Sequence, residues 1–254
     1  MNQNGFLKIA AIGIVFLANA GVATSNVLEP IYNTSNPIEH VLSVGAWDTT
    51  SYNMNGMTVT ANFANGLSET RTWSNGSVIG TDGWSLFINQ PSGVPLAQIS
   101  TMWYGFTLDV TSNDVRITSL IIDGLAGDTV FDVNPSIDPS VSTDLSLDGK
   151  PVGTGYKDYS GASSVRMSND VTVQATYGTQ VALNGRDPKG DLYGTLTLAF
   201  SNPFTSESQL YFVSDTDNVD RSPVPEPATL VLFGVGLTGL LGSRRKNQRK
   251  LSSY

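Results

Sequence analysis

The sequence predicts an all-β chain, organised as a single antiparallel β-sandwich of jelly-roll type between two apolar terminal segments. Thr, Ser, Asn and Gly dominate the body of the chain, and hydrophobic residues alternate with polar ones over several segments separated by turn residues. The 254 residues include no cysteine, so neither disulfides nor a thiolate nucleophile is available. The fold must therefore rest on one sizeable apolar core.

The chain begins with a segment typical of a secretory signal peptide. A lysine precedes the apolar run at 9–17, and the triplet Ala-Asn-Ala at 18–20 supplies the small residues that a signal peptidase reads. We expect residues 1–20 to be removed, with cleavage after Ala23 as the alternative. Residues 21–38 are then an N-terminal extension of the mature protein.

The predicted sandwich spans residues 39–214. Period-two alternation predicts strands at 57–63, 67–73, 101–110, 171–177, 191–200 and 209–214. The Asn65-Gly66 pair predicts a tight hairpin turn between the first two of these. At 115–122 the alternation slips, which predicts either a bulge or burial on both faces.

The hydrophobic faces of two of these strands predict the centre of the core. The expected core residues are Tyr104, Phe106, Leu108, Leu196, Leu198 and Phe200. Residues 134–164 are too rich in Pro, Gly, Ser and Asp to form a core strand of any length. We expect a long surface excursion there, which is either a disordered or loosely packed flap or a binding loop.

The body of the chain is strongly acidic. Residues 21–223 hold 21 of the 22 acidic residues but 8 of the 14 basic ones, which leaves a net charge of 8 minus 21, or −13. Such a surface repels nucleic acid and anionic lipid, so we expect no nucleic-acid partner. We expect it either to attract calcium or cationic surfaces or to be simply a solvated face.

The sequence offers little catalytic chemistry. His40 is the only histidine, and no Gly-x-Ser-x-Gly elbow occurs, so we predict no catalytic residues and no enzyme activity. Asp215, Asp217 and Asp220 form a weak calcium candidate because they concentrate oxygen ligands in one short segment. We favour the alternative that 215–223 is a polar linker, and we expect no cofactor other than this candidate calcium.

The last 31 residues, 224–254, have three distinct parts. A rigid Pro225-Glu226-Pro227 precedes an uncharged run at 228–243, which as a helix would be about 24 Å long, short against a hydrocarbon core of roughly 30 Å. A basic cluster follows, consisting of Arg244, Arg245, Lys246, Arg249 and Lys250. We expect this run to form a membrane-spanning helix. The basic cluster after it stays in the cytoplasm, and the body of the protein lies outside.

This order of parts resembles the C-terminal sorting signal of PEP-CTERM proteins. The resemblance implies that an exosortase, a membrane-embedded processing enzyme, recognises Pro225, Glu226 and Pro227 and removes the tail. It thus implies two processing partners, signal peptidase and an exosortase, and transient anchoring in the inner membrane. Residues 83–91 and 117–133 also resemble segments of exported PEP-CTERM bodies, which are mostly uncharacterised.

Three functions are compatible with these features. We favour a non-enzymatic protein of the cell surface or extracellular matrix, associated with exopolysaccharide or biofilm. The alternative is a carbohydrate-binding jelly-roll module, in which exposed aromatic rings would stack on sugars; the candidate rings are Trp47, Trp73, Trp84, Trp103 and Tyr104. A glycoside hydrolase is less favoured, because a carboxylate pair alone is a weak signal in so acidic a chain.

Overall fold

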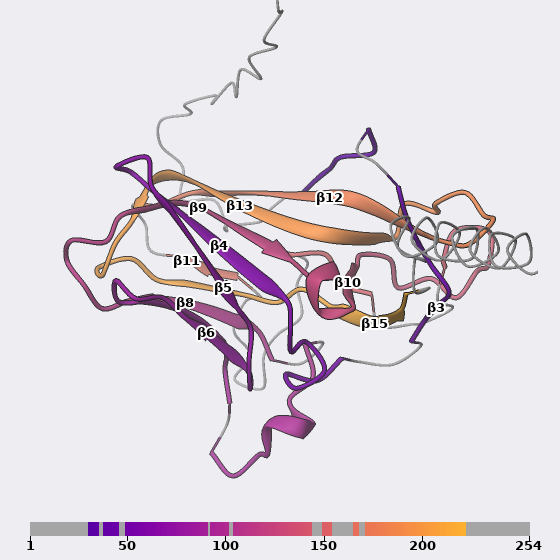
Figure 1. Ribbon diagram of the computed structural model, residues 1–254, viewed down its shortest axis with the longest axis horizontal. Helices are drawn as coiled ribbons and strands as arrows, with labels where there is room; N and C mark the ends of the chain where they lie inside the picture. The colour runs from indigo at the N-terminus through magenta and orange to yellow at the C-terminus, as the bar shows by residue number, and fades with distance from the viewer. Residues whose placement is uncertain are drawn as a thin grey trace, which may run out of the picture.

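The computed structural model describes residues 30–35, 38–45, 49–90, 92–101, 104–143, 149–153, 165–167 and 171–221. These residues form two β-sheets that enclose a shared hydrophobic core (Figure 1). Within these ranges the helical elements are two short 3-10 helices, η1 (Leu96–Gln98) and η2 (Leu125–Gly127). The prediction of an all-β chain is confirmed.

The larger sheet contains ten strands, seven of them in the order β3-β15-β10-β13-β9-β4-β5. The long strand β12 also pairs with β13, and it receives β1 and β2. The strands of this sheet are β1 (Ile31–Tyr32), β2 (Glu39–Val41), β3 (Ser43–Val44), β4 (Thr58–Phe63), β5 (Ser68–Thr72), β9 (Ile117–Asp123), β10 (Thr129–Asp132), β12 (Val173–Leu183), β13 (Leu192–Phe204) and β15 (Thr216–Asp220). Strands β1 and β2 run parallel to β12, so the predicted antiparallel arrangement is wrong at this edge.

The smaller sheet has five strands in the order β11-β14-β8-β7-β6, and all its pairs are antiparallel. Its strands are β6 (Ser77–Ile79), β7 (Trp84–Ile88), β8 (Phe106–Val110), β11 (Val165–Met167) and β14 (Leu210–Phe212). The predicted strand at 101–110 is shorter than expected, because β8 begins only at Phe106.

The predicted hairpin joins β4 and β5 in antiparallel register. Its turn follows from backbone hydrogen bonds: the Gly66 N–H donates to Phe63 O (3.0 Å), and the Phe63 N–H donates to Leu67 O (2.9 Å). Gly66 has a φ of 83°, a left-handed conformation that glycine adopts without a steric penalty. The connection is a three-residue loop closed by this glycine, a common hairpin type.

The irregular segment at 115–122 resolves as a bulge. Asn62 lies opposite Ser119 and Phe63 lies opposite Ile117, so the register shifts by one residue between the two pairs. Beyond this point β9 alternates normally, and Ile121 is 37% exposed between two fully buried neighbours. Of the two predicted explanations the bulge is therefore confirmed.

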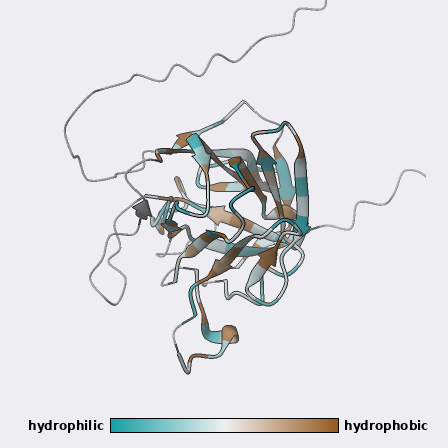
Figure 2. Ribbon diagram, turned by 90° about the vertical axis from the view of Figure 1, so that its left-hand side faces the viewer, coloured by the Kyte–Doolittle hydropathy of each residue, from teal (hydrophilic) through white to brown (hydrophobic). Residues whose placement is uncertain are grey.

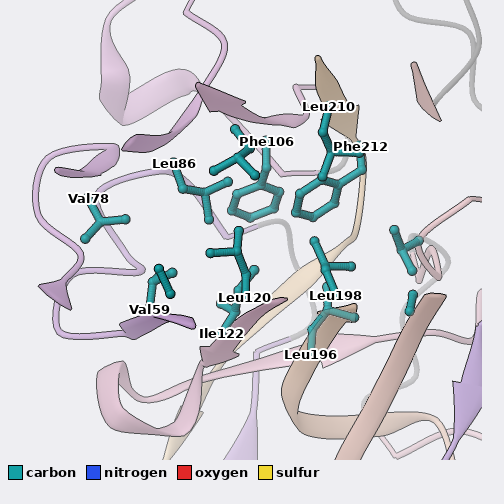
Figure 3. Packing of buried hydrophobic residues seen from close by; sticks show 14 of the residues in the cluster. Val59, Val78, Leu86, Phe106, Leu120, Ile122, Leu196, Leu198, Leu210 and Phe212 are labelled. Carbon is teal, nitrogen blue, oxygen red and sulfur yellow. The ribbon is translucent and has the colours of Figure 1, made fainter. Parts of the chain in front are cut away.

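Apolar side chains from both sheets meet in the core (Figure 3). Residues of the larger sheet such as Leu120 and Leu198 face Leu86, Phe106 and Phe212 of the smaller one. Hydrophobic and polar residues alternate along the strands, and Figure 2 shows them as brown and teal bands. Five of the six predicted core residues are buried, namely Phe106, Leu108, Leu196, Leu198 and Phe200. The sixth, Tyr104, is half-buried, because it precedes β8 and packs at the edge of the core.

Two segments differ from their predicted role as extension or linker. Residues 31–32 pair with β12, and residues 216–220 form β15, which lies between β3 and β10. The linker prediction rested on the polar composition of this segment. It is wrong because backbone hydrogen bonds to a strand on each side can hold a polar segment in a sheet. The described part of the excursion at 134–164 is also partly internal. There Val152 is fully buried, and its N–H donates to the Tyr177 hydroxyl (2.7 Å).

Candidate functional site

The predicted targeting residues lie outside the described part of the chain. These are the signal peptide at 1–20, the sorting residues Pro225, Glu226 and Pro227, the apolar run at 228–243, and the basic cluster Arg244, Arg245, Lys246, Arg249 and Lys250. In the ranges that the structure describes, no helix has the length and apolar character needed to cross a membrane. The candidate sites within the folded body are a buried carboxylate cluster and a surface groove.

The carboxylate cluster consists of Asp132, Asp215 and Asp217. Each side chain is fully buried, and ligand atoms of the three residues lie within 4.8 Å of one another. Asp132 ends β10, and its N–H donates to Asp215 O (3.2 Å), so the two aspartates are cross-strand neighbours. Asp215 and Asp217 are two residues apart along the chain and therefore project to the same face.

The structure corrects the predicted calcium candidate at one position. Asp220 is three residues from Asp217 and so falls on the other face of β15, where it is exposed. Its Oδ2 accepts a hydrogen bond from Ser43 Oγ (2.8 Å), at the edge formed with β3. The sequence also missed Asp132, which is distant in the chain and carries no local signal.

The surroundings of the cluster are polar. Thr101 Oγ1 donates to Asp215 Oδ1 (3.2 Å), and the Asn134 N–H donates to Asp132 Oδ1 (2.9 Å). Lys150 is 8% exposed, and its backbone bonds to both Asp132 and Asp215. Three carboxylates this close repel one another when ionised, and a divalent cation offsets that repulsion. Carboxylate oxygens are also the ligands that calcium prefers, so these residues fit the predicted ion.

Calcium is therefore expected to raise the melting temperature, and Asp217→Asn to remove most of that rise. At 10 to 100 times its Kd, an ion that binds only the folded state adds roughly 1.4 to 2.7 kcal/mol. Thermal unfolding of each variant, with calcium and with a chelator, measures this difference. Asp220→Asn is the matched control and should keep the full rise. Equal melting temperatures with calcium and with chelator would contradict the prediction.

Two of the five rings predicted for the sugar platform, Trp73 and Trp84, lie inside the protein. Trp73 and Trp84 are each 1% exposed, and Tyr104 is half-buried. Trp47 and Trp103 lie outside the described residues. Trp73 contacts Phe106 edge to face, with ring centroids 5.7 Å apart, so it belongs to the core. The hypothesis that Trp73 and Trp84 stack on sugars is therefore wrong.

Trp84 instead belongs to a hydrogen-bond cluster around Glu69. The Trp84 indole N–H donates to Glu69 Oε2 (2.6 Å), while Thr81 donates both its N–H (2.9 Å) and its hydroxyl (2.7 Å) to Oε1. Arg71 Nε donates to the same oxygen (2.7 Å). Desolvation acts to raise the pKa of Glu69, but these hydrogen bonds outweigh it and lower the pKa to about 2. The ionised carboxylate thus joins β5 of the larger sheet to the β6–β7 turn of the smaller one.

A groove of about 540 Å³ lies beside this cluster, at one end of the two sheets. The residues that shape it include Phe63, Leu67, Glu69, Asp82, Asp114 and Arg116. A second groove of about 460 Å³ adjoins the first, and Arg116 lines both. The sequence did not predict this site, because its residues come from separate connections whose convergence depends on the packing of the sheets.

Comparison with known proteins identifies one feature of the chain. Residues 223–246 match the family model described as the PEP-CTERM protein-sorting motif. No curated protein and no solved structure matches the chain. The resemblance seen in the tail is thus confirmed.

Proposed function

Because the chain carries a PEP-CTERM protein-sorting motif and is therefore an exported substrate of an exosortase, we propose that its body is a non-enzymatic component of the cell surface or extracellular matrix. The motif is the observation that carries the proposal. In this proposal signal peptidase and an exosortase trim the two ends, and the tail anchors the precursor in the inner membrane until it is cut. The two packed sheets then act outside the cytoplasm as a β-sandwich scaffold.

The geometry of the described titratable groups supports a role other than catalysis. A glycosidase needs a general acid that holds its proton near neutral pH. Among the carboxylates that line the groove, Glu69 is the least exposed. Hydrogen bonds lower its pKa to about 2, so it does not hold a proton near neutral pH. His40 lies exposed on β2, opposite Ala182, as a surface residue. These positions make a hydrolase the least favoured of the three functions.

The alternative of a carbohydrate-binding module is favoured by one observation, the groove at the end of the sheets. Its lining combines hydroxyl, carboxylate and guanidinium groups with the apolar side chains of Phe63 and Leu67. That mixture suits a ligand with both hydroxyl groups and apolar faces. In this alternative extracellular polysaccharide is the partner, and the groove replaces the tryptophan platform as its site.

The mature protein is expected to lack residues 228–254, because the sorting motif directs removal of the tail. Mass spectrometry of protein recovered from its native host measures the terminus directly. Replacing Glu226 by alanine should leave precursor with an intact C-terminal tail in the membrane fraction, whereas the matched Glu207→Ala variant should be processed normally. Glu207 is a suitable control because its side chain lies exposed in the connection before β14.

The location of the processed body is tested on the same material. We expect it in the cell-surface or extracellular-matrix fraction after the tail is cut. An intact terminus at Tyr254 in the native host would replace the sorting proposal with a permanent anchor. A processed body found entirely in the periplasm would instead overturn the surface and matrix role alone.

A further inference from the structure

Four chain connections converge at one end of the two sheets, seen at the left of Figure 1. They are the β4–β5 turn, the β6–β7 turn, the β8–β9 connection and the β13–β14 connection. The two adjoining grooves lie among them. Each groove, of about 540 and 460 Å³, has the volume of a site for a small molecule or a few units of a polymer. Their shared residue, Arg116, makes the pair one continuous binding surface.

Hydrogen bonds between neighbouring connections hold the walls of these grooves together. The Ala64 N–H donates to Arg116 O (2.9 Å), and the Thr111 N–H donates to Gly83 O (2.8 Å). Ser206 Oγ donates to Asn113 Oδ1 (2.6 Å) across the second groove. Together with the Glu69 cluster, these bonds link every pair of neighbouring connections. A ligand would therefore bind without first ordering the loops, which reduces the entropy lost on binding.

Arg116 is the central hydrogen-bond donor of this surface. Its side chain is exposed, and its guanidinium forms no ion pair with any residue in the described ranges. Its guanidinium offers five N–H donors in a fixed plane at the junction of the grooves. Asp114 and Asp82 lie exposed in the first groove and Glu207 in the second, so acceptors surround the donor.

The charges define the ligand class. Asp82, Asp114 and Glu207 outnumber Arg116, and the body as a whole is acidic, so an anionic polymer would be repelled. Hydroxyl groups are both donors and acceptors, and they can therefore bond to the carboxylates and to the guanidinium at once. Leu67, which is 66% exposed on the rim, offers an apolar contact to the CH face of a sugar ring.

We propose that this double groove binds a neutral polysaccharide chain, with Arg116 as the central contact between two sugar-binding subsites. The inference deepens the carbohydrate-binding alternative and takes from the proposed function only its extracellular location. Asp114 contributes the acceptor on one side of Arg116, and Glu207 contributes the acceptor on the other. Glu69 is a positioning residue, since all of its bonds hold the walls and none reaches the open groove.

The test uses the full-length chain, purified in a polyoxyethylene detergent so that no sugar headgroup competes. The probes are four neutral hexasaccharides with β-1,4-glucan, β-1,3-glucan, α-1,4-glucan and β-1,4-mannan linkages, and hexagalacturonate as the anionic counterpart. Isothermal titration measures each affinity. At least one neutral probe is expected to bind, and its affinity should be insensitive to added salt because no net charge is neutralised.

Arg116→Ala is expected to weaken that binding about 10- to 100-fold, the factor that corresponds to losing hydrogen bonds from a charged donor. Asp114→Asn should weaken it less, and the melting temperature of both variants should stay unchanged because both side chains are exposed. The matched control is Arg186→Ala, an exposed arginine in the β12–β13 turn at the opposite end of the sheets, which should bind as the wild type does.

Three results would overturn the proposal. They are binding of none of the neutral hexasaccharides, equal binding by wild type and Arg116→Ala, and stronger binding of hexagalacturonate than of every neutral probe. None of these results involves tail processing or cell fractionation. If the polysaccharide-binding proposal fails, the conclusions on sorting and location are therefore unaffected. Conversely, finding the processed protein in another compartment would not change the affinities measured by isothermal titration.

Discussion

Replacing Phe106 by alanine is expected to lower the free energy of unfolding by about 3 to 5 kcal/mol. Phe106 is fully buried between the sheets, stacked on Phe212 with ring centroids 5.1 Å apart and edge-on to Trp73 at 5.7 Å. Alanine would remove the ring and leave a cavity that β-strands fixed by backbone pairing can only partly close. Urea unfolding followed by tryptophan fluorescence measures the change, with an unchanged m value as the check on two-state behaviour.

The matched control is Phe87→Ala on the neighbouring strand. Phe87 lies on the other face of the smaller sheet, opposite Thr107, and is only half-buried. Its loss should cost about 1 kcal/mol or less, since little apolar area returns to water. Equal losses for the two variants would contradict the arrangement in which only the Phe106 face of the smaller sheet packs against the larger one.

Replacing Glu69 by glutamine is expected to cost about 1 to 3 kcal/mol at pH 7. The folded protein lowers the pKa of this carboxyl from 4.5 to about 2, and each unit corresponds to about 1.4 kcal/mol, reduced here by partial solvent screening. A glutamine has one oxygen, which would stay with the three donors from Thr81 and Arg71, so its amide N–H₂ would face the Trp84 indole N–H. The buried Trp84 indole N–H would then lack an acceptor.

The pH dependence has a definite sign. A lowered pKa in the folded state stabilises the protein above the unfolded value of 4.5, and the contribution is lost as pH falls from 4.5 towards 2. The difference in unfolding free energy between wild type and Glu69→Gln should therefore be constant above pH 5 and shrink below 4.5. Exposed Glu207→Gln is the control and should show no such difference. A gap between wild type and Glu69→Gln that persists unchanged at pH 2.5 would disprove the electrostatic account of the cluster.

Several elements could be predicted because their signals are local. The alternation through Phe106, Leu108 and Val110 sets which face of β8 is buried, and Asn65-Gly66 locates the β4–β5 turn. The slip at 115–122 correctly indicated irregular pairing, since a bulge changes which side chains share a face. The sorting motif could also be recognised from the sequence, because its three parts are consecutive in the chain.

Other features could not be predicted because their partners are distant. The polar segment at 216–220 resembles a linker by composition, yet it pairs with β3 and β10 and becomes β15. Trp84 was a candidate ring for a sugar platform, yet its indole turns inward to Glu69, fifteen residues earlier in the chain. In both cases a hydrogen-bond partner supplied by another strand decided the outcome.

The sequence by itself determined several of the central strands, the face of each that enters the core, the hairpin turn and the sorting signal. Each depends on residues close together in the chain, where side-chain periodicity and turn chemistry act. Only the tertiary structure decided that Asp132 joins Asp215 and Asp217, and that Arg116 lies between two grooves. Both sites combine residues that are far apart in the sequence, and the order and register of the strands set their geometry.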